Sequence, residues 1–494
     1  MNENIPSYIV AATASLGGYV FGYEVGVISS ILEMHNFNEY FNNPTAIIKG
    51  TVAAITTLGS LVGSMLSGHL SDKISRKRTI ILGGIIMIVG SAVQSSAVNV
   101  ILLICGRLIS GLGVGLLSAT VPAYQSELSH PKIRGRLISL QQLAITIGVM
   151  VAFWVDFAFS RYKNSQFQWR GPLMMQLAFC LVFILQMFRM PYSPRWLLSK
   201  GKYEKAVRSL MFLRSTKDRN SEKILYEVSE IKREILRERE LGISSYSKLF
   251  VFPNRRKMVL GVLIQAFQQL SGVNAMIYYA PRIFKTTNIM SDNDVFIAQG
   301  LFGVVSFLFT IPAVVYVDKW GRKKLLIIGA VGSGTCHLIV ALASAFGSKK
   351  VFDSVGNQQT IYISTVASWV SVIFIYIFII FFAFSWGPVG WIYPAEIFST
   401  TVKAKGTSIT TACNWGMNFL VALLSPLLLD KLGWMTYLFF MVPMYASAFI
   451  IYSFFPETKG KTYEEIDGMF YKSMWVNKQG KPGLPLRNVH MSAA

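Results

Sequence analysis

The feature that most constrains this chain is the repeated occurrence of apolar runs long enough to cross a lipid bilayer. The first run, Tyr8 to Leu32, contains a single charged residue, Glu24. A membrane-spanning helix needs about 20 consecutive, mostly apolar residues. Runs of this kind lie near 8–32, 49–70, 79–97, 100–122, 137–160, 171–190, 258–283, 295–317, 324–347, 362–393, 407–429 and 434–455. The sequence therefore predicts an all-α membrane protein with twelve transmembrane helices.

The composition agrees with this class and argues against others. Of the 494 residues, 52% are hydrophobic and only 15% are charged, which is too little charge for the surface of a soluble protein of this length. The formal net charge is +22, but the Lys and Arg residues lie mostly between the apolar runs. This distribution follows the positive-inside rule, whereas a nucleic-acid-binding protein would gather its charge on one basic surface. We expect contact with membrane lipid and no nucleic-acid partner.

A polar, basic stretch separates two sets of six apolar runs. The predicted domains are an N-terminal six-helix bundle at 1–190, a linker with short helices at 191–257, a C-terminal six-helix bundle at 258–456 and a tail at 457–494. The positive charge of the linker predicts that it lies in the cytoplasm. Six spans on either side then place both termini, and therefore the tail, in the cytoplasm.

The two halves repeat each other in sequence. The segment GHLSDKISRKR at 68–78 matches YVDKWGRKK at 316–324, with an acid just before the basic residues. The segment SELSHPKIRGR at 126–136 matches AEIFSTTVKAK at 395–405, with an acid seven residues before a base. Parallel six-helix repeats with a substrate site between them at mid-membrane are a known design of secondary transporters.

Together, the motifs of this chain resemble the sugar porter family of the major facilitator superfamily, and their wording is most like that of fungal hexose transporters. The motifs are GRLISGLGVGLLSATVPAYQSELSHPKIRGRL, PYSPRWLL, FQQLSGVNAMIYYAP and PETKGKTYEEID. The resemblance extends from about residue 10 to residue 468. It implies the major facilitator fold, a plasma-membrane location and transport of a monosaccharide, glucose or another hexose, by alternating access.

A sugar offers hydroxyls and no charge, so its pocket needs neutral amides and an aromatic face. The resemblance implies that Trp391 is the aromatic platform and that five amides contact the sugar, namely Gln142, Gln268, Gln269, Asn274 and Asn414. An amide inside a span can instead join two helices. Gly272 and the Gly387–Pro388 pair are expected to break the seventh and tenth spans beside these residues.

Charged residues in the repeated loops resemble those that close the cytoplasmic side in this family. They are Asp72, Arg76, Glu127 and Arg134 in the first half, and Asp318, Arg322, Glu396 and Lys403 in the second. Asp72, at a helix end, is expected to bind arginines of the neighbouring loop. Glu127 is expected to pair with Arg134, and Glu396 with Lys403. The alternative is that these charges only orient the helices. Ser75 stands where the family usually has Gly.

Glu24 is an acid inside a span, where a charge is costly and usually functional. The resemblance pairs it with Arg107, and proton-coupled sugar porters carry an acid at this position. If the arginine moves away during the transport cycle, the acid takes up a proton, which couples proton and sugar movement. In the alternative, a permanent ion pair joins two helices and the sugar moves by facilitated diffusion. Gly111 and Gly115, which follow Arg107, should allow close helix packing.

Other functions share many of these motifs. A porter for myo-inositol or another polyol and a transporter-like sugar receptor both remain alternatives. Such receptors usually carry a long cytoplasmic tail, whereas about forty residues follow Pro456 here, which favours transport. No nucleophile–base set, phosphate loop or metal-ligand cluster is visible, so we expect neither an enzyme nor a cofactor or metal site. The expected small-molecule partners are a sugar and, in the coupled case, protons.

Overall fold

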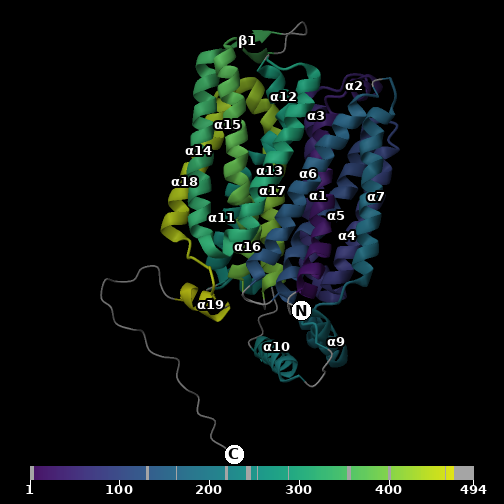
Figure 1. The fold of residues 1–494 in the computed structure, drawn as a ribbon, viewed down its shortest axis with the longest axis vertical. Coiled ribbons are helices and arrows are strands. Elements are labelled where there is room, and N and C mark those ends of the chain that lie inside the picture. Colours follow the sequence, from purple (N-terminus) through teal and green to yellow (C-terminus); the bar gives the residue numbers. More distant parts are fainter. Residues whose placement is uncertain are drawn as a thin grey trace, which may run out of the picture.

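The chain folds into two bundles of long helices that stand side by side (Figure 1). The computed structural model describes residues 5–129, 133–162, 164–216, 221–240, 246–252, 254–287, 289–352, 358–398, 402–461 and 463–471. We call the first bundle the N half and the second the C half. They meet through α1 (Ile5–Ile31), α3 (Ala46–Ile74), α5 (Val100–Leu128) and α6 (Arg134–Ser160) on one side and α12 (Val273–Thr286), α13 (Asp292–Trp320), α16 (Trp386–Ile397) and α17 (Lys403–Leu432) on the other.

The N half contains six unbroken spans, each long and apolar enough to cross a membrane. They are α1 (Ile5–Ile31), α3 (Ala46–Ile74), α4 (Arg76–Ser95), α5 (Val100–Leu128), α6 (Arg134–Ser160) and α7 (Phe167–Arg189). A short helix, α2 (His35–Tyr40), connects α1 to α3.

The C half also makes six crossings, but two of them are divided into two helices. The undivided helices are α13 (Asp292–Trp320), α14 (Arg322–Gly347), α17 (Lys403–Leu432) and α18 (Met435–Phe454). The divided crossings are α11 (Asn254–Leu270) with α12 (Val273–Thr286), and α15 (Thr365–Phe384) with α16 (Trp386–Ile397). Eleven segments of the described residues satisfy the length and apolarity of a membrane span, with Thr365–Ile397 counted once. The α11–α12 pair supplies the twelfth crossing, so the predicted twelve-helix fold is confirmed.

The two breaks have different causes. Gly272 adopts φ 81° and ψ 5°, a left-handed conformation that suits glycine, and it separates α11 from α12 where the sequence predicted. The second break was predicted at Gly387–Pro388, but it lies at Ser385, which has φ −125° and ψ −83°. Pro388 instead lies in the first turn of α16. A proline is tolerated there because the N–H that it lacks would have no partner within the helix.

Short elements mark the two ends of the molecule. At one end, here called the linker end, lie α8 (Pro194–Ser199), α9 (Tyr203–Leu213), α10 (Glu222–Glu240), the 3-10 helix η2 (Tyr246–Phe250) and α19 (Tyr463–Tyr471). The opposite end, the hairpin end, carries the antiparallel strands β1 (Ser348–Phe352) and β2 (Gln358–Tyr362), with Ser348 opposite Tyr362 (Figure 1). This hairpin is not predicted by the hydropathy pattern.

Glycines bring helix backbones into direct contact inside the N half. A Cβ added to Gly111 of α5 would lie 2.2 Å from the carbonyl oxygen of Thr56 on α3, and one added to Gly115 would lie 2.1 Å from that of Ser60. No larger side chain fits without moving the helices. The close packing of α5 expected from these two glycines is therefore observed, and it positions Arg107 one turn away from the contact.

Candidate functional site

Glu24 and Arg107 form an ion pair in the interior of the N half. Glu24 lies on α1 and Arg107 on α5, and both residues are 0% exposed. Arg107 Nη1 lies 3.3 Å from Glu24 Oε1. The two residues that the sequence analysis linked are thus neighbours in the fold, and the charge of each is compensated by the other.

Further polar groups from three helices complete the surroundings of this pair. Ser110 Oγ donates to Glu24 Oε1 at 2.9 Å, and Gln176 Nε2 of α7 donates to Glu24 Oε2. Gln94 of α4 donates to Glu24 Oε1 at 3.4 Å and accepts from Arg107 Nη1 at 3.4 Å. The sequence analysis missed these residues, although a search for polar side chains inside the apolar spans would have found them.

The C half holds a cluster of neutral amides where α11, α12 and α17 meet. Gln269 Nε2 donates to Asn414 Oδ1 at 3.0 Å, and Asn274 Nδ2 donates to Gln269 Oε1. Asn414 Nδ2 in turn donates to Gln268 Oε1 at 2.7 Å and to Gln265 Oε1 at 2.5 Å. Four of the five predicted sugar-contacting amides are thus joined in one network, together with Gln265, which was not predicted.

Two of these amides also bind the backbone of the divided crossing α15–α16. Gln265 Nε2 donates to the carbonyl oxygen of Gly390 at 3.0 Å, and Gln268 Nε2 donates to that of Trp386 at 2.8 Å. In an unbroken helix Gly390 would receive its hydrogen bond from residue 394, but Pro394 has no N–H. Gln265 therefore satisfies a buried carbonyl group that α16 itself cannot satisfy.

The remaining predicted sugar-site residues connect the two halves. Trp391 Nε1 of α16 donates to Gln142 Oε1 of α6 at 3.0 Å. Gln268 lies against the same turn of α16, since its Nε2 would be 2.2 Å from a Cβ added to Gly390. Phe21 of α1 contacts Trp391 edge-on with the ring centres 6.5 Å apart. The six predicted residues therefore lie together, at the contact between the N half and the C half.

The amides of this cluster pair N–H donors with C=O acceptors, and the cluster contains no charge. A sugar hydroxyl is both a donor and an acceptor, so it can replace either partner in such a pair. The indole of Trp391 adds an apolar face. This combination suits a neutral, polyhydroxylated ligand better than an ion or a fatty molecule.

The charged motif of the N half forms a network at the linker end. Arg76 Nη1 lies 2.9 Å from Asp72 Oδ1, and Arg76 Nε lies 2.9 Å from Glu127 Oε1. Ser193 Oγ donates to Glu127 Oε2 at 2.5 Å. Arg76 is thus a partner of Glu127 that was not predicted, and the predicted pairing of Glu127 with Arg134 stays a prediction. Arg134 begins α6, and its side chain lies outside the described part of the structure.

The C half repeats this network with corresponding residues. Arg322 Nη2 lies 2.8 Å from Asp318 Oδ1 and 2.6 Å from Glu396 Oε1. Thus Arg322 binds the glutamate that we expected to pair with Lys403. Lys403 Nζ donates to Ser126 Oγ of the N half at 3.5 Å. In both halves the arginine at the start of a span reaches the glutamate because it lies at the adjacent end of a neighbouring helix, which linear spacing does not reveal.

Contacts between the halves occur on both sides of the amide cluster. At the linker end, Gly135 of α6 packs on the Asp318–Arg322 pair, whose atoms Oδ1 and Nη2 would both lie 2.4 Å from an added Cβ. At the hairpin end, Ser30 Oγ donates to Gln299 Oε1 at 3.0 Å, and Gln299 Nε2 donates to Ser29 Oγ at 2.5 Å. In this conformation both ends hold the halves together.

A second buried acid, Asp156 on α6, was missed by the sequence analysis. Asp156 is 0% exposed, and neither of its carboxyl oxygens has a hydrogen-bond partner among the described residues. The hydroxyl of Ser30, which lies close to Asp156, donates its hydrogen bond to Gln299 Oε1 instead. The signal that identified Glu24, a lone acid in an apolar run, would also have identified Asp156.

Comparison with known proteins gives a consistent result. A family model described as "Sugar (and other) transporter" matches residues 10–470. A high-affinity glucose transporter of Kluyveromyces lactis is 32% identical over 486 residues, which cover 97% of this chain and 88% of that protein. The high glucose sensor RGT2 of Saccharomyces cerevisiae is also 32% identical, over 96% of this chain but only 62% of the sensor.

Solved structures of one transporter have the same fold. The proton:xylose symporter XylE bound to 6-bromo-6-deoxy-D-glucose superposes with a TM-score of 0.80 at 28% identity, covering 94% of this chain and 100% of that one. The inward-open conformation of XylE from E. coli gives a TM-score of 0.70 at 26% identity, with coverages of 94% and 99%. The conformation described here is thus closer to the sugar-bound structure than to the inward-open one.

Proposed function

The chain belongs to the sugar transporter family, and on this premise we propose that it carries a monosaccharide, glucose or another hexose, across a membrane by alternating access. The observation that carries the proposal is the uncharged cluster of amides with Trp391, at the contact between two six-helix halves. The glucose transporters among its relatives support glucose as the first substrate to test.

The linker end faces the cytoplasm in this proposal, together with both termini, and the protein resides in the plasma membrane. The support for the orientation is the basic charge of the linker and of the two loops that carry Arg76 and Arg322. The charged networks at that end are then the cytoplasmic gate. The contacts of Gln299 with Ser29 and Ser30 belong to the extracellular gate.

Sugar binding replaces contacts between protein amides by contacts with hydroxyls. Because Gln142 belongs to the N half and Gln268 and Asn414 to the C half, a sugar between them binds both halves at once. Opening the cytoplasmic gate requires separation of Gly135 from the Asp318–Arg322 pair. Opening the extracellular gate requires separation of Gln299 from α1. Transport proceeds when one gate opens while the other stays closed.

Proton coupling is the more specific part of the proposal, and α12 supplies the link between sugar and charge. Asn274 of the amide cluster and Tyr278 are four residues apart, so they share one face of α12. Tyr278 is buried close to Arg107 and Glu24. A movement of α12 that follows sugar binding at Asn274 therefore changes the surroundings of the ion pair.

Protonation of Glu24 completes the coupling cycle. With Arg107 Nη1 at 3.3 Å from Glu24 Oε1, a negative charge on the carboxylate is compensated by a neighbouring cation. When Arg107 moves away, the buried carboxylate loses that compensation and binds a proton from the side that is open. The return of Arg107 expels the proton to the other side. This cycle makes the protein a symporter, whereas a pair that never separates makes it a facilitator.

The test is uptake of labelled glucose into proteoliposomes, with and without an inward proton gradient. We expect accumulation above equilibrium only with the gradient. Uptake that stops at equilibrium in both cases would refute the coupling and leave the transport function intact. Glu24→Gln should abolish accumulation and retain exchange of sugar across the membrane. Asp156→Asn is the matched control, because it removes another buried acid of the N half and should leave accumulation unchanged.

A sensor function is the second candidate, because RGT2 is among the relatives. Purified protein that binds glucose but moves neither glucose nor any competing sugar would favour this candidate. Uptake of myo-inositol that glucose does not inhibit would instead make the protein a polyol porter.

A further inference from the structure

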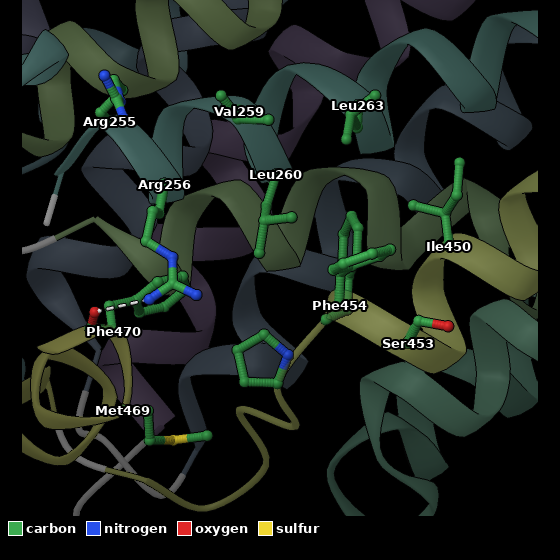
Figure 2. Close-up of a pocket in the computed structure, with 12 residues that line it drawn as sticks. Arg255, Arg256, Val259, Leu260, Leu263, Ile450, Ser453, Phe454, Met469 and Phe470 are labelled. Atoms are coloured by element: carbon green, nitrogen blue, oxygen red, sulfur yellow. Dashed lines mark hydrogen bonds between the residues drawn. The ribbon is translucent and has the colours of Figure 1, made fainter. Parts of the chain in front are cut away.

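A cavity of about 760 Å³ lies on the outside of the C half, far from the amide cluster along α11. Figure 2 shows its three walls, which are the first turns of α11, the last turns of α18, and α19. The apolar lining comes mainly from Val259, Leu260 and Leu263 on α11 and from Ile450 and Phe454 on α18.

The polar end of this cavity is formed by two arginines, Arg255 and Arg256. Arg256 Nη1 donates to the carbonyl oxygen of Phe470 at 3.3 Å (Figure 2). Among the described residues, no carboxylate forms an ion pair with either arginine. The next residue, Lys257, differs because it is buried and paired with Asp467 of α19. Within the described part of the chain, two positive charges without an ion-pair partner therefore lie beside an apolar wall.

The cavity lies where the bundle surface changes from apolar to basic. Side chains on the outside of α18 next to it are apolar or aromatic and exposed, with Phe449 at 69%, Tyr452 at 70% and Phe454 at 45%. Such a surface faces the acyl chains of the membrane. Asn254, at the start of α11, follows the polar linker directly. The arginines are thus level with the lipid headgroups at the linker end.

We propose that this cavity binds an anionic phospholipid. The lipid phosphate is bound by Arg255 and Arg256, whose guanidinium groups can each make two parallel hydrogen bonds to a phosphate. The acyl chains pack on the wall formed by Val259, Leu263 and Phe454. Basic pockets between transmembrane helices on the cytoplasmic side are suited to anionic lipid headgroups. That the lipid comes from the cytoplasmic leaflet rests on the proposed orientation, but the binding itself does not.

Such a lipid would bridge three separate elements. It would contact α11, whose other end carries Gln265, Gln268 and Gln269 of the amide cluster, and it would also contact α18 and α19. A bound lipid therefore holds the linker-end part of the seventh crossing in its present position. We expect the lipid to stabilise the conformation described here.

The experiment measures lipid retention and thermal unfolding of the full chain. Protein in phosphatidylcholine nanodiscs is compared with protein in discs that also contain phosphatidylinositol. The lipid that stays bound when the protein is released from the discs is counted by native mass spectrometry. We expect phosphatidylinositol to stay bound and to raise the unfolding temperature. The double variant Arg255→Gln/Arg256→Gln should retain it about tenfold less well, as the loss of charge-assisted hydrogen bonds implies.

The matched control is Arg208→Gln/Lys232→Gln, which removes the same charge from exposed positions of α9 and α10. It should retain phosphatidylinositol like the unmodified protein. Leu263→Trp fills the apolar part of the cavity and keeps both arginines, and it should also lose the lipid. This second variant tests the cavity even if the arginine variant fails to fold.

Three outcomes would overturn the proposal. Equal retention by the arginine variant and the control would mean that the arginines do not hold the lipid. If the protein retained phosphatidylcholine as well as phosphatidylinositol, the negative charge of the lipid headgroup would not be recognised. If inorganic phosphate raised the unfolding temperature as much as phosphatidylinositol does, the cavity would be a site for free phosphate. None of these results depends on sugar transport, so the proposed function stands or fails separately.

Discussion

At the linker end, the N half and the C half use one arrangement twice. In each half an arginine at the start of a span, Arg76 or Arg322, binds an aspartate four residues earlier. The residue before the arginine has nearly the same backbone in both, with φ 100° and ψ 154° at Ser75 and φ 88° and ψ 152° at Gly321. The repeat in sequence is therefore also a repeat in geometry.

At the centre of the membrane the two halves differ. The N half has unbroken spans and a buried ion pair, whereas the C half has two divided crossings and a network of neutral amides. The division explains part of the amide network, because Gln265 binds a backbone carbonyl that Pro394 leaves without a partner. The charged network at the linker end is therefore duplicated, whereas the polar groups at the centre are not, with an ion pair in one half and neutral amides in the other.

The largest effect should come from removing the cation of the buried ion pair in the N half. Arg107→Gln leaves Glu24 buried without a cation, and loss of one partner of a buried pair costs about 3–5 kcal/mol. We expect a fall of that size in the free energy of unfolding, measured by denaturant titration in detergent. The double variant Glu24→Gln/Arg107→Gln should recover most of it. If Arg107→Gln alone were as stable as the unmodified protein, the ion pair would not stabilise the N half.

A smaller effect should come from the contact of Gly135 in the N half with the charged network of the C half. Gly135→Ala places a methyl group against Asp318 and Arg322, and overpacking of this kind costs about 1–3 kcal/mol. The linker end should open, which a longer distance between spin labels at Arg78 and Lys324 would report. Gly468→Ala is the control, since nothing lies within 4 Å of the added Cβ. An unchanged label distance in Gly135→Ala would show that this contact does not close the gate.

A substitution in the amide network should weaken sugar binding in addition to lowering the stability of the protein. Asn414→Ala removes donors and acceptors from the proposed sugar site, and the loss of about 1–1.5 kcal/mol per hydrogen bond predicts a KM for sugar uptake about tenfold higher. Gln125→Ala is the matched control, because Gln125 is a buried amide that joins α5 to Ala11 and Ser15 within the N half. It should lower stability and leave KM unchanged. Equal effects on KM would assign Asn414 a structural role.

The smallest effect concerns the residue before the arginine, which is Ser75 in one turn and Gly321 in the other. Ser75 is a buried residue with positive φ, a conformation that costs a non-glycine residue about 1–3 kcal/mol. Its hydroxyl offsets part of this cost by accepting from the Arg78 N–H at 3.2 Å. Ser75→Gly should therefore stabilise the protein by about 1 kcal/mol. Gly321→Ser should destabilise it, and thermal unfolding of both variants checks the pair. A destabilised Ser75→Gly variant would mean that the hydroxyl cap outweighs the strain.

Several parts of this protein were accessible from the sequence because they depend on local properties. The length and apolarity of each run are properties of consecutive residues, and they predicted the twelve crossings and the two halves. A lone acid at position 24 and the amides at positions 268, 269, 274 and 414 stand out against an apolar background for the same reason. The break at Gly272 follows from a glycine whose backbone adopts positive φ.

Only the tertiary structure decided which of these groups meet. Gln176 and Ser110 bind Glu24, Arg76 binds Glu127, and Gln142 meets Trp391 across the two halves. These partners are far apart in the chain, and their contact depends on the rotation and tilt with which helices pack. Hydropathy is nearly the same on every side of a buried span and does not record that rotation. The sequence therefore determined what each span contains, and the packing of the helices determined what each side chain binds.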